Sequence, residues 1–142
     1  MNIWKKITVA RRLISNYIFY TARPRYVNPI WSLRKYFEFL GEKNFKKINK
    51  GELYDLVQVL LKKSESTGCE YADYYALYKA VEKTNANYIL ELGSGISTCI
   101  IAYALMKKEE CQGIKGEVVT MEESEFYYNN FLSIIPEYLK KY

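Results

Sequence analysis

The sequence contains no histidine, so any general base in this chain must be an Asp, Glu, Lys, Tyr or Cys side chain. It has only 3 cysteines, Cys69, Cys99 and Cys111, and no two of them have Cys-x-x-Cys spacing. This sparse set argues against both a zinc site and a disulfide scaffold, so no metal is expected. Cysteines that stay reduced are typical of a cytosolic protein, and we expect a cytoplasmic location.

Long apolar runs are also lacking. No segment reaches the roughly 18 apolar residues that span a bilayer, so no transmembrane segment is expected. Arg11 and Arg12 interrupt the apolar residues near the N-terminus, which argues against a signal peptide. The overall apolar content of 49% is nevertheless sufficient for a packed core, which argues against a disordered chain.

Acidic residues are scarce in the first third of the chain. Residues 1–50 hold 12 Lys or Arg and 2 Glu, whereas residues 51–142 hold 9 Lys or Arg and 14 Asp or Glu. The net charges of these two regions are therefore +10 and −5. A basic region of this kind either meets an acidic partner, such as a membrane surface, a nucleic acid or an anionic substrate, or is a solvated lysine-rich surface.

The basic region begins with an amphipathic pattern over residues 2–21. Basic residues fall mainly on one side of the predicted helix, and the other side carries apolar residues at helical spacing: Ile3, Trp4, Ile7, Ala10, Leu13, Ile14, Tyr17 and Ile18. Two interpretations stay open. The helix packs on its own domain or on a partner, or it makes peripheral contact with an anionic membrane surface.

A second helix has clear start and stop signals. Asn28 is a good N-cap, Pro29 suits the first helical position, and Gly41 suits the exit. The polar, lysine-rich stretch that follows is the candidate boundary between a basic, aromatic helical region, residues 1–50, and a second domain, residues 51–142. No helix-turn-helix, RRM-type aromatic box or zinc finger occurs, which argues against a nucleic-acid partner.

The second domain has the pattern of an α/β segment. Apolar spacing and turn residues predict the following elements, in order: a helix over 52–63, a helix over 71–83, a strand over 88–92, a helix over 97–108, a strand over 117–121 and a helix over 124–134. The first strand reads as buried, and it enters its helix through the turn Gly93-Ser94-Gly95. Strand, glycine turn, helix and strand are the plan of a nucleotide-type cofactor site at the edge of a parallel sheet.

The glycine turn suits an anionic or polar ligand. Gly93 can adopt backbone angles that a residue with a Cβ resists, and Gly95 leaves the main chain open to a ligand. The helix that follows presents unpaired N–H groups, which favour a carboxylate or a phosphate. Ser97 and Thr98 either add hydroxyl donors to this site or cap the helix.

An acidic pair, Glu122 and Glu123, follows the second strand. A carboxylate at this end of the strand faces the crevice beside the glycine turn and can accept hydrogen bonds from both hydroxyls of a ribose. Because successive residues of a strand point to opposite sides, the two carboxylates cannot easily share that task. We favour Glu122 over Glu123.

The run from Glu91 to Thr98 resembles the first motif of class I S-adenosylmethionine-dependent methyltransferases. The resemblance implies that Gly93, Ser94 and Gly95 hold the methionine part of the cofactor, with Ser97 and Thr98 alongside. It also implies that Glu91 lies near the cofactor's amino group and that Glu122 binds the ribose. The implied reaction is methyl transfer to an unidentified acceptor, such as an anionic small molecule. The NAD fingerprint would require glycine in place of Thr98, which disfavours hydride transfer.

The resemblance covers only about half of the chain. It implies a Rossmann-like fold of which the first two parallel strands and their flanking helices are present, preceded by a helical N-terminal region. Two strands cannot bury their own faces, so we expect a truncated N-terminal portion of a longer enzyme, inactive alone. No residue can be named as catalytic from the sequence. The alternative is a non-catalytic interaction or membrane-surface protein with a remnant α/β scaffold.

Overall fold

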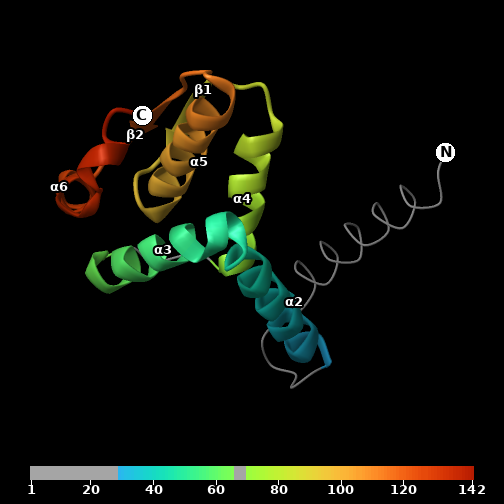
Figure 1. Cartoon of the computed structure of the whole chain (residues 1–142). Helices are drawn as coiled ribbons and strands as arrows, with labels where there is room; N and C mark the ends of the chain where they lie inside the picture. The colour runs from blue at the N-terminus through green and yellow to red at the C-terminus, as the bar shows by residue number, and fades with distance from the viewer. Residues whose placement is uncertain (1–28, 66–69) are drawn as a thin grey trace. The chain divides into compact units, whose positions relative to one another are not determined.

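The computed structural model describes residues 29–65 and 70–142 (Figure 1). The amphipathic pattern over residues 2–21 and the N-cap predicted at Asn28 lie outside these described residues. The chain divides into two compact units, the second of which begins at Phe37 and continues to Tyr142. This second unit contains the core, the sheet and the candidate site.

The described part of the chain is mostly helical, with one small parallel sheet. Its elements are α2 (Pro29–Phe45), η1 (Ile48–Gly51), α3 (Glu52–Lys63), α4 (Tyr71–Lys83), β1 (Tyr88–Leu92), α5 (Ile96–Gln112), β2 (Glu117–Met121), α6 (Glu125–Ile134) and η2 (Glu137–Leu139). Every element predicted between residues 52 and 134 is present at or close to its predicted bounds. No helix within residues 29–65 and 70–142 is long and apolar enough to cross a membrane.

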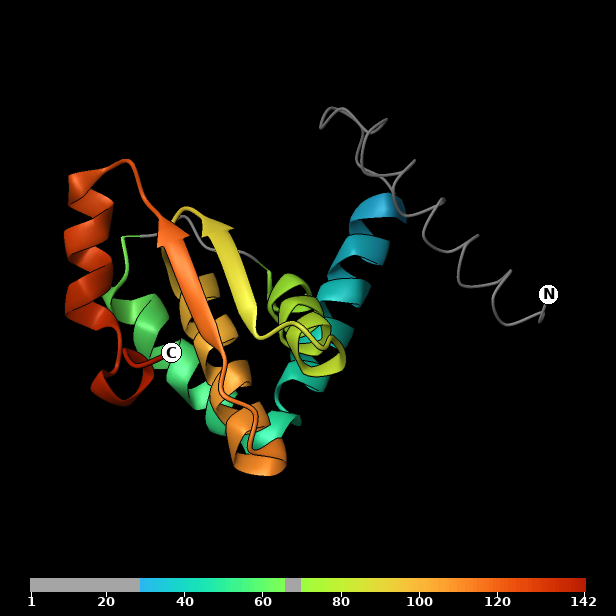
Figure 2. The same cartoon turned by 90° about the horizontal axis from the view of Figure 1, so that it is seen from above.

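Strands β1 and β2 pair in parallel, with Tyr88 opposite Glu117 and Leu92 opposite Met121. Helix α5 connects them and lies behind them in Figure 2. This strand–helix–strand unit is compatible with part of an α/β fold. It also brings the carboxyl ends of both strands to the same edge, where the candidate site lies.

The sheet buries only one of its faces. Ile89 and Val118 pack against the core, whereas the alternate residues of both strands point outward and stay exposed: Tyr88, Leu90, Leu92, Val119 and Met121. The prediction that the first strand is buried is therefore wrong for Tyr88, Leu90 and Leu92, three of its five residues. Within the described residues the sheet has two strands. Larger parallel sheets are covered by helices on both faces, whereas no described element covers the outward face of this one.

Helix α5 is the centre of the core, because it is buried on nearly all sides. Five of its apolar residues are all less than 4% exposed: Ile100, Ile101, Tyr103, Ala104 and Leu105. The helix extends past its predicted end to Gln112, so Lys108 is not in its last turn. Lys108 is instead buried and donates hydrogen bonds to the carbonyl oxygens of Thr84 and Ala86, at 2.9 and 3.0 Å. It thereby ties α5 to the segment between α4 and β1.

Helix α2 does not end at Gly41, as its sequence predicted, but continues to Phe45. A Cβ atom built on Gly41 would lie 2.5 Å from the Cα of Ala72 in α4, so this glycine permits close contact between two helices. One turn earlier, Glu38 accepts hydrogen bonds from the backbone N–H groups of Tyr71, at 2.7 Å, and Ala72, at 3.4 Å. A side chain of α2 therefore caps the N-terminus of α4.

The C-terminal residues return to the open side of β2. The carbonyl oxygen of Tyr142 accepts a hydrogen bond from the backbone N–H of Val118 at 2.6 Å. The Tyr142 side chain is buried, and its hydroxyl donates to a carboxylate oxygen of Glu109 in α5. The end of the described chain is thus anchored to both the sheet and the central helix.

Candidate functional site

The glycine turn begins with a residue in the left-handed backbone region. Gly93 has a φ of +96°, and its N–H donates to the carbonyl oxygen of Met121 at 2.8 Å. A Cβ at this position would meet no atom within 4 Å, so the requirement for glycine is conformational rather than steric. The backbone freedom predicted for Gly93 is thus used here, and the turn is hydrogen-bonded to the end of β2.

Glu122 links the glycine turn to the segment after β2. One carboxylate oxygen accepts from the backbone N–H of Ser94 at 2.9 Å and from the Ser94 hydroxyl at 3.2 Å. The other accepts from the backbone N–H of Ser124 at 2.9 Å. These backbone donors, Ser124 first and then Ser94, lower the pKa of Glu122 from its ordinary value of 4.5. The structure brings Glu122 to the turn and leaves Glu123 exposed.

Because its folded-state pKa is lowered, Glu122 stabilises the fold at pH values above 4.5, and this contribution disappears as the pH falls toward the lowered value. We expect Glu122→Gln to be less stable than the wild type at neutral pH and to lose less stability in acid. Urea denaturation followed by circular dichroism from neutral pH to below pH 4.5 measures this difference. The control is Glu123→Gln, and parallel pH profiles for wild type and Glu122→Gln would contradict the assignment.

A second, buried polar cluster caps the N-terminus of α5. The Thr98 hydroxyl donates to a carboxylate oxygen of Glu91 at 2.5 Å and accepts from the backbone N–H of Gly95 at 3.1 Å. Thr98 is only 3% exposed, so its hydroxyl caps the helix rather than facing a ligand. Ser97 is half-buried in the first turn of α5, and its hydroxyl has no hydrogen-bond partner among the described residues.

Replacing Thr98 tests this internal cluster. Thr98→Val keeps the shape but leaves the N–H of Gly95 and an oxygen of Glu91 without their partner. We expect it to lower the free energy of unfolding by about 2 kcal/mol. Thr98→Ser keeps the hydroxyl and is expected to lose only about 1 kcal/mol, from the missing methyl group. Urea denaturation of both variants and the wild type gives the comparison, and a Thr98→Val variant as stable as the wild type would show that the hydroxyl contributes nothing.

Cys99 lies next to this cluster but offers no reactive group. It is fully buried, and loss of solvation, with a smaller effect of the nearby Glu91, raises the pKa of its thiol to about 12. The thiol is therefore protonated at neutral pH and cannot serve as a base or nucleophile. No group of three or more His, Cys, Asp and Glu side chains in the described part of the chain is placed to hold a metal ion.

The site is thus an edge where two strands end and α5 begins. It brings together the turn Gly93-Ser94-Gly95, the Ser97 hydroxyl and the Glu122 carboxylate. Gly95 is buried and its N–H donates to Thr98, so the prediction that this glycine leaves the main chain open to a ligand is wrong for its N–H. The structure brings these predicted residues together and turns Thr98 and Glu91 toward each other. The sequence did not predict the N–H of Ser124 as a partner of Glu122. Ser124 also caps α6, because its side chain accepts a hydrogen bond from the backbone N–H of Tyr127.

Comparisons with known proteins supply no further assignment. Neither the protein-family models nor the curated proteins nor the solved structures contain a match to this chain.

Proposed function

We propose that this chain contributes to methyl transfer by binding S-adenosylmethionine at the glycine turn. The observation that supports this most is the position of Glu122. This residue directly follows β2, and its carboxylate accepts a hydrogen bond from the backbone N–H of Ser94. A nucleoside cofactor requires this pairing, in which one strand supplies the turn and the next supplies an acceptor for ribose hydroxyls. Both are present at the carboxyl edge of one parallel strand pair.

The residues fit a nucleoside with an amino-acid tail. Glu122 retains acceptor capacity beyond its three bonds, and a ribose hydroxyl can also replace the weak contact from the Ser94 hydroxyl at 3.2 Å. The N-terminus of α5 and the Ser97 hydroxyl suit the carboxylate of the tail. Glu91, whose other oxygen bonds Thr98, suits its amino group.

S-adenosylmethionine supplies, when bound, a methyl group on a positively charged sulfur that an oxygen, nitrogen or carbon nucleophile can accept. The part proposed for this chain is to hold and orient the donor, so that approach of an acceptor becomes productive. A dinucleotide is a poorer fit, because the third glycine of that fingerprint is replaced by Thr98. The Thr98 side chain fills the first turn of α5 and is buried.

Calorimetric titration of the full chain with S-adenosylhomocysteine tests the proposal. We expect saturable binding, and we expect Gly95→Asp to abolish it. Gly95 has an extended φ of 168° at the N-cap of α5, a position that tolerates aspartate, but it is buried, so circular dichroism must show that this variant is folded. The new carboxylate would repel that of the ligand. A folded wild-type chain that shows no binding would contradict the proposal.

A further inference from the structure

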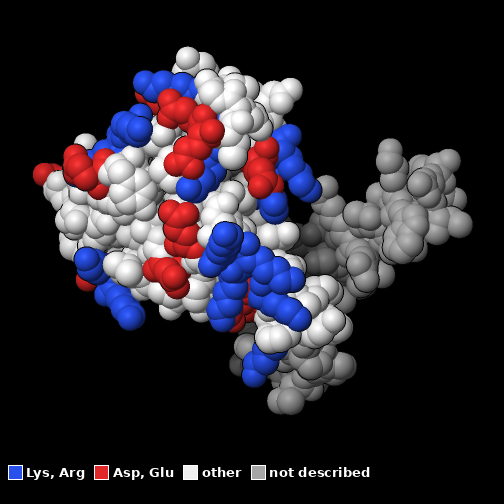
Figure 3. Space-filling view, viewed as in Figure 1, with Lys and Arg blue, Asp and Glu red and all other residues white. Residues whose placement is uncertain are grey.

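Four exposed lysines form a basic surface at the end of α2, in the turn that follows it and in η1. These residues, here named the lysine stripe, are Lys43, Lys46, Lys47 and Lys50. Figure 3 shows Lys and Arg side chains gathered over the junction between α2 and α3. Lys46 and Lys47 lie in the turn after α2, where the N–H of Lys46 donates to the carbonyl oxygen of Glu42 at 2.9 Å and so continues the helical path. The spacing of three to four residues therefore places both lysines next to Lys43.

Most of this charge is not neutralised by the protein itself. Lys46 pairs with Glu42 at 2.7 Å and lies over the ring of Tyr54, 4.6 Å from its centroid. Lys43, Lys47 and Lys50 have no ion pair with any carboxylate among the described residues. The stripe therefore presents a local excess of positive charge that is available to an anionic partner.

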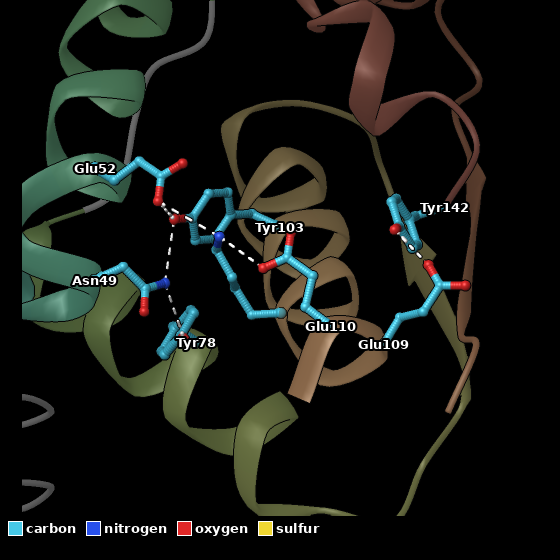
Figure 4. A network of polar contacts seen from close by, with 8 residues as sticks. Asn49, Glu52, Tyr78, Tyr103, Glu109, Glu110 and Tyr142 are labelled. Carbon is cyan, nitrogen blue, oxygen red and sulfur yellow. Dashed lines mark hydrogen bonds and ion pairs between the residues drawn. The ribbon is translucent and has the colours of Figure 1, made fainter. Parts of the chain in front are cut away.

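The core holds the stripe in one arrangement. Phe45 and Ile48, which alternate with its lysines, are 0% and 6% exposed. Asn49 donates from its side-chain nitrogen to the hydroxyl oxygens of Tyr103, at 3.1 Å, and Tyr78, at 3.5 Å, as Figure 4 shows. Its backbone and that of Lys50 lie in the left-handed region, with φ of 46° and 58°. The side-chain bonds of Asn49 thus hold a turn with backbone angles that are uncommon for residues other than glycine. In this turn the Lys50 side chain is exposed.

An exposed aromatic ring extends the stripe. Phe39 is 58% exposed and precedes Lys43 by four residues and Lys46 by seven, so it lies on the same side of α2. A phenyl ring beside lysines on a convex helix face is the chemistry of proteins that dock on anionic bilayers. The ring enters the headgroup region, while the ammonium groups meet lipid phosphates and carboxylates.

We propose that Phe39 and the lysine stripe dock this protein on a bilayer surface that contains anionic phospholipids. We favour a lipid surface over a single-stranded nucleic acid because the ring of Phe39 projects from an exposed helix surface beside the lysines. Stacking of successive bases uses several rings along a groove. This surface lies within the second compact unit and is separate from the glycine turn, so the proposal does not depend on the proposed function.

Vesicle sedimentation of the full chain tests this inference. We expect binding to phosphatidylcholine vesicles that contain phosphatidylserine, none to phosphatidylcholine alone, and loss of binding at high salt. The triple variant Lys43→Gln/Lys47→Gln/Lys50→Gln should bind about 100-fold more weakly, since each lysine near such a surface contributes about fivefold. Lys62→Gln/Lys63→Gln/Lys83→Gln removes the same charge from exposed lysines elsewhere and should change binding by only a few-fold.

Phe39→Ala separates insertion from electrostatic attraction. It should weaken vesicle binding by a similar factor at each salt concentration at which the wild type still binds, because it removes apolar contact rather than charge. Circular dichroism must show that each variant is folded. The proposal is overturned if the stripe triple variant binds as the wild type does while Arg11→Glu/Arg12→Glu abolishes binding. It is equally overturned if the chain binds single-stranded RNA through the stripe and ignores anionic vesicles.

Discussion

Gly41→Ala is expected to destabilise the fold by about 3 kcal/mol, although alanine is the better helix former. Within α2, helix propensity alone would favour alanine over glycine by about 1 kcal/mol. Contact with α4 outweighs this gain, because the new Cβ would lie 2.5 Å from the Cα, 2.6 Å from the Cβ and 2.7 Å from the N of Ala72. Two of these three atoms belong to the backbone and cannot move by a rotamer change, so the helices must separate.

Separation would affect more than one contact. Glu38 caps the first turn of α4, and Phe45 contacts the rings of Tyr71 and Tyr74 with centroid distances of 5.8 and 6.1 Å. Both interactions depend on the same approach of α2 to α4. Chemical denaturation provides the measurement, with Lys43→Ala as the matched control two residues along the same helix. We expect the control to lie within about 0.5 kcal/mol of the wild type. A Gly41→Ala variant as stable as the wild type would show that the helices do not meet at this glycine.

The largest functional effect is expected from Glu122→Ala, which should weaken binding of S-adenosylhomocysteine about 100-fold. The substitution removes the proposed acceptor of two ribose hydroxyls. It also frees the N–H of Ser94 and of Ser124, which now hold the carboxylate in place. Calorimetric titration of folded variants measures the change.

Glu123→Ala is the matched control, because it removes the same charge from the adjacent position. The exposed Glu123 side chain is not placed against the turn, so we expect its removal to change affinity by less than about threefold. Equal loss of affinity in both variants would indicate a general charge effect. Loss in Glu123→Ala alone would assign the ribose to the other member of the pair.

Local patterns in the sequence predicted most of the described elements. The helices over residues 52–63 and 71–83 and both strands follow from apolar spacing and from the turns between them, and the structure confirms their bounds. Gly41 was misinterpreted as a helix exit because glycine serves two purposes, helix termination and close helix contact. Which one applies depends on Ala72, 31 residues away, and no local pattern reveals that contact.

The candidate site was predictable to a similar degree. The left-handed backbone at Gly93 and the approach of Glu122 to the turn follow from parallel strands that end at one edge. The bond between Thr98 and Glu91 was not predicted, because it depends on the rotation of α5 about its axis relative to β1. That rotation is set by packing of the whole helix in the core. The exposure of Leu90 and Leu92 was missed for a related reason, since an apolar strand pattern does not show which layers cover it.

The most direct test of the cofactor site is an NMR titration of the isotope-labelled full chain with S-adenosylhomocysteine. The account predicts saturable shifts of the backbone N–H signals of Gly93, Ser94, Gly95 and Ser124, with those of α3 unchanged. The Ser124 signal is informative, because its N–H donates to the carboxylate of Glu122. Saturable binding that shifts other residues and leaves these four unchanged, or a folded chain that shows no shifts, would contradict the account.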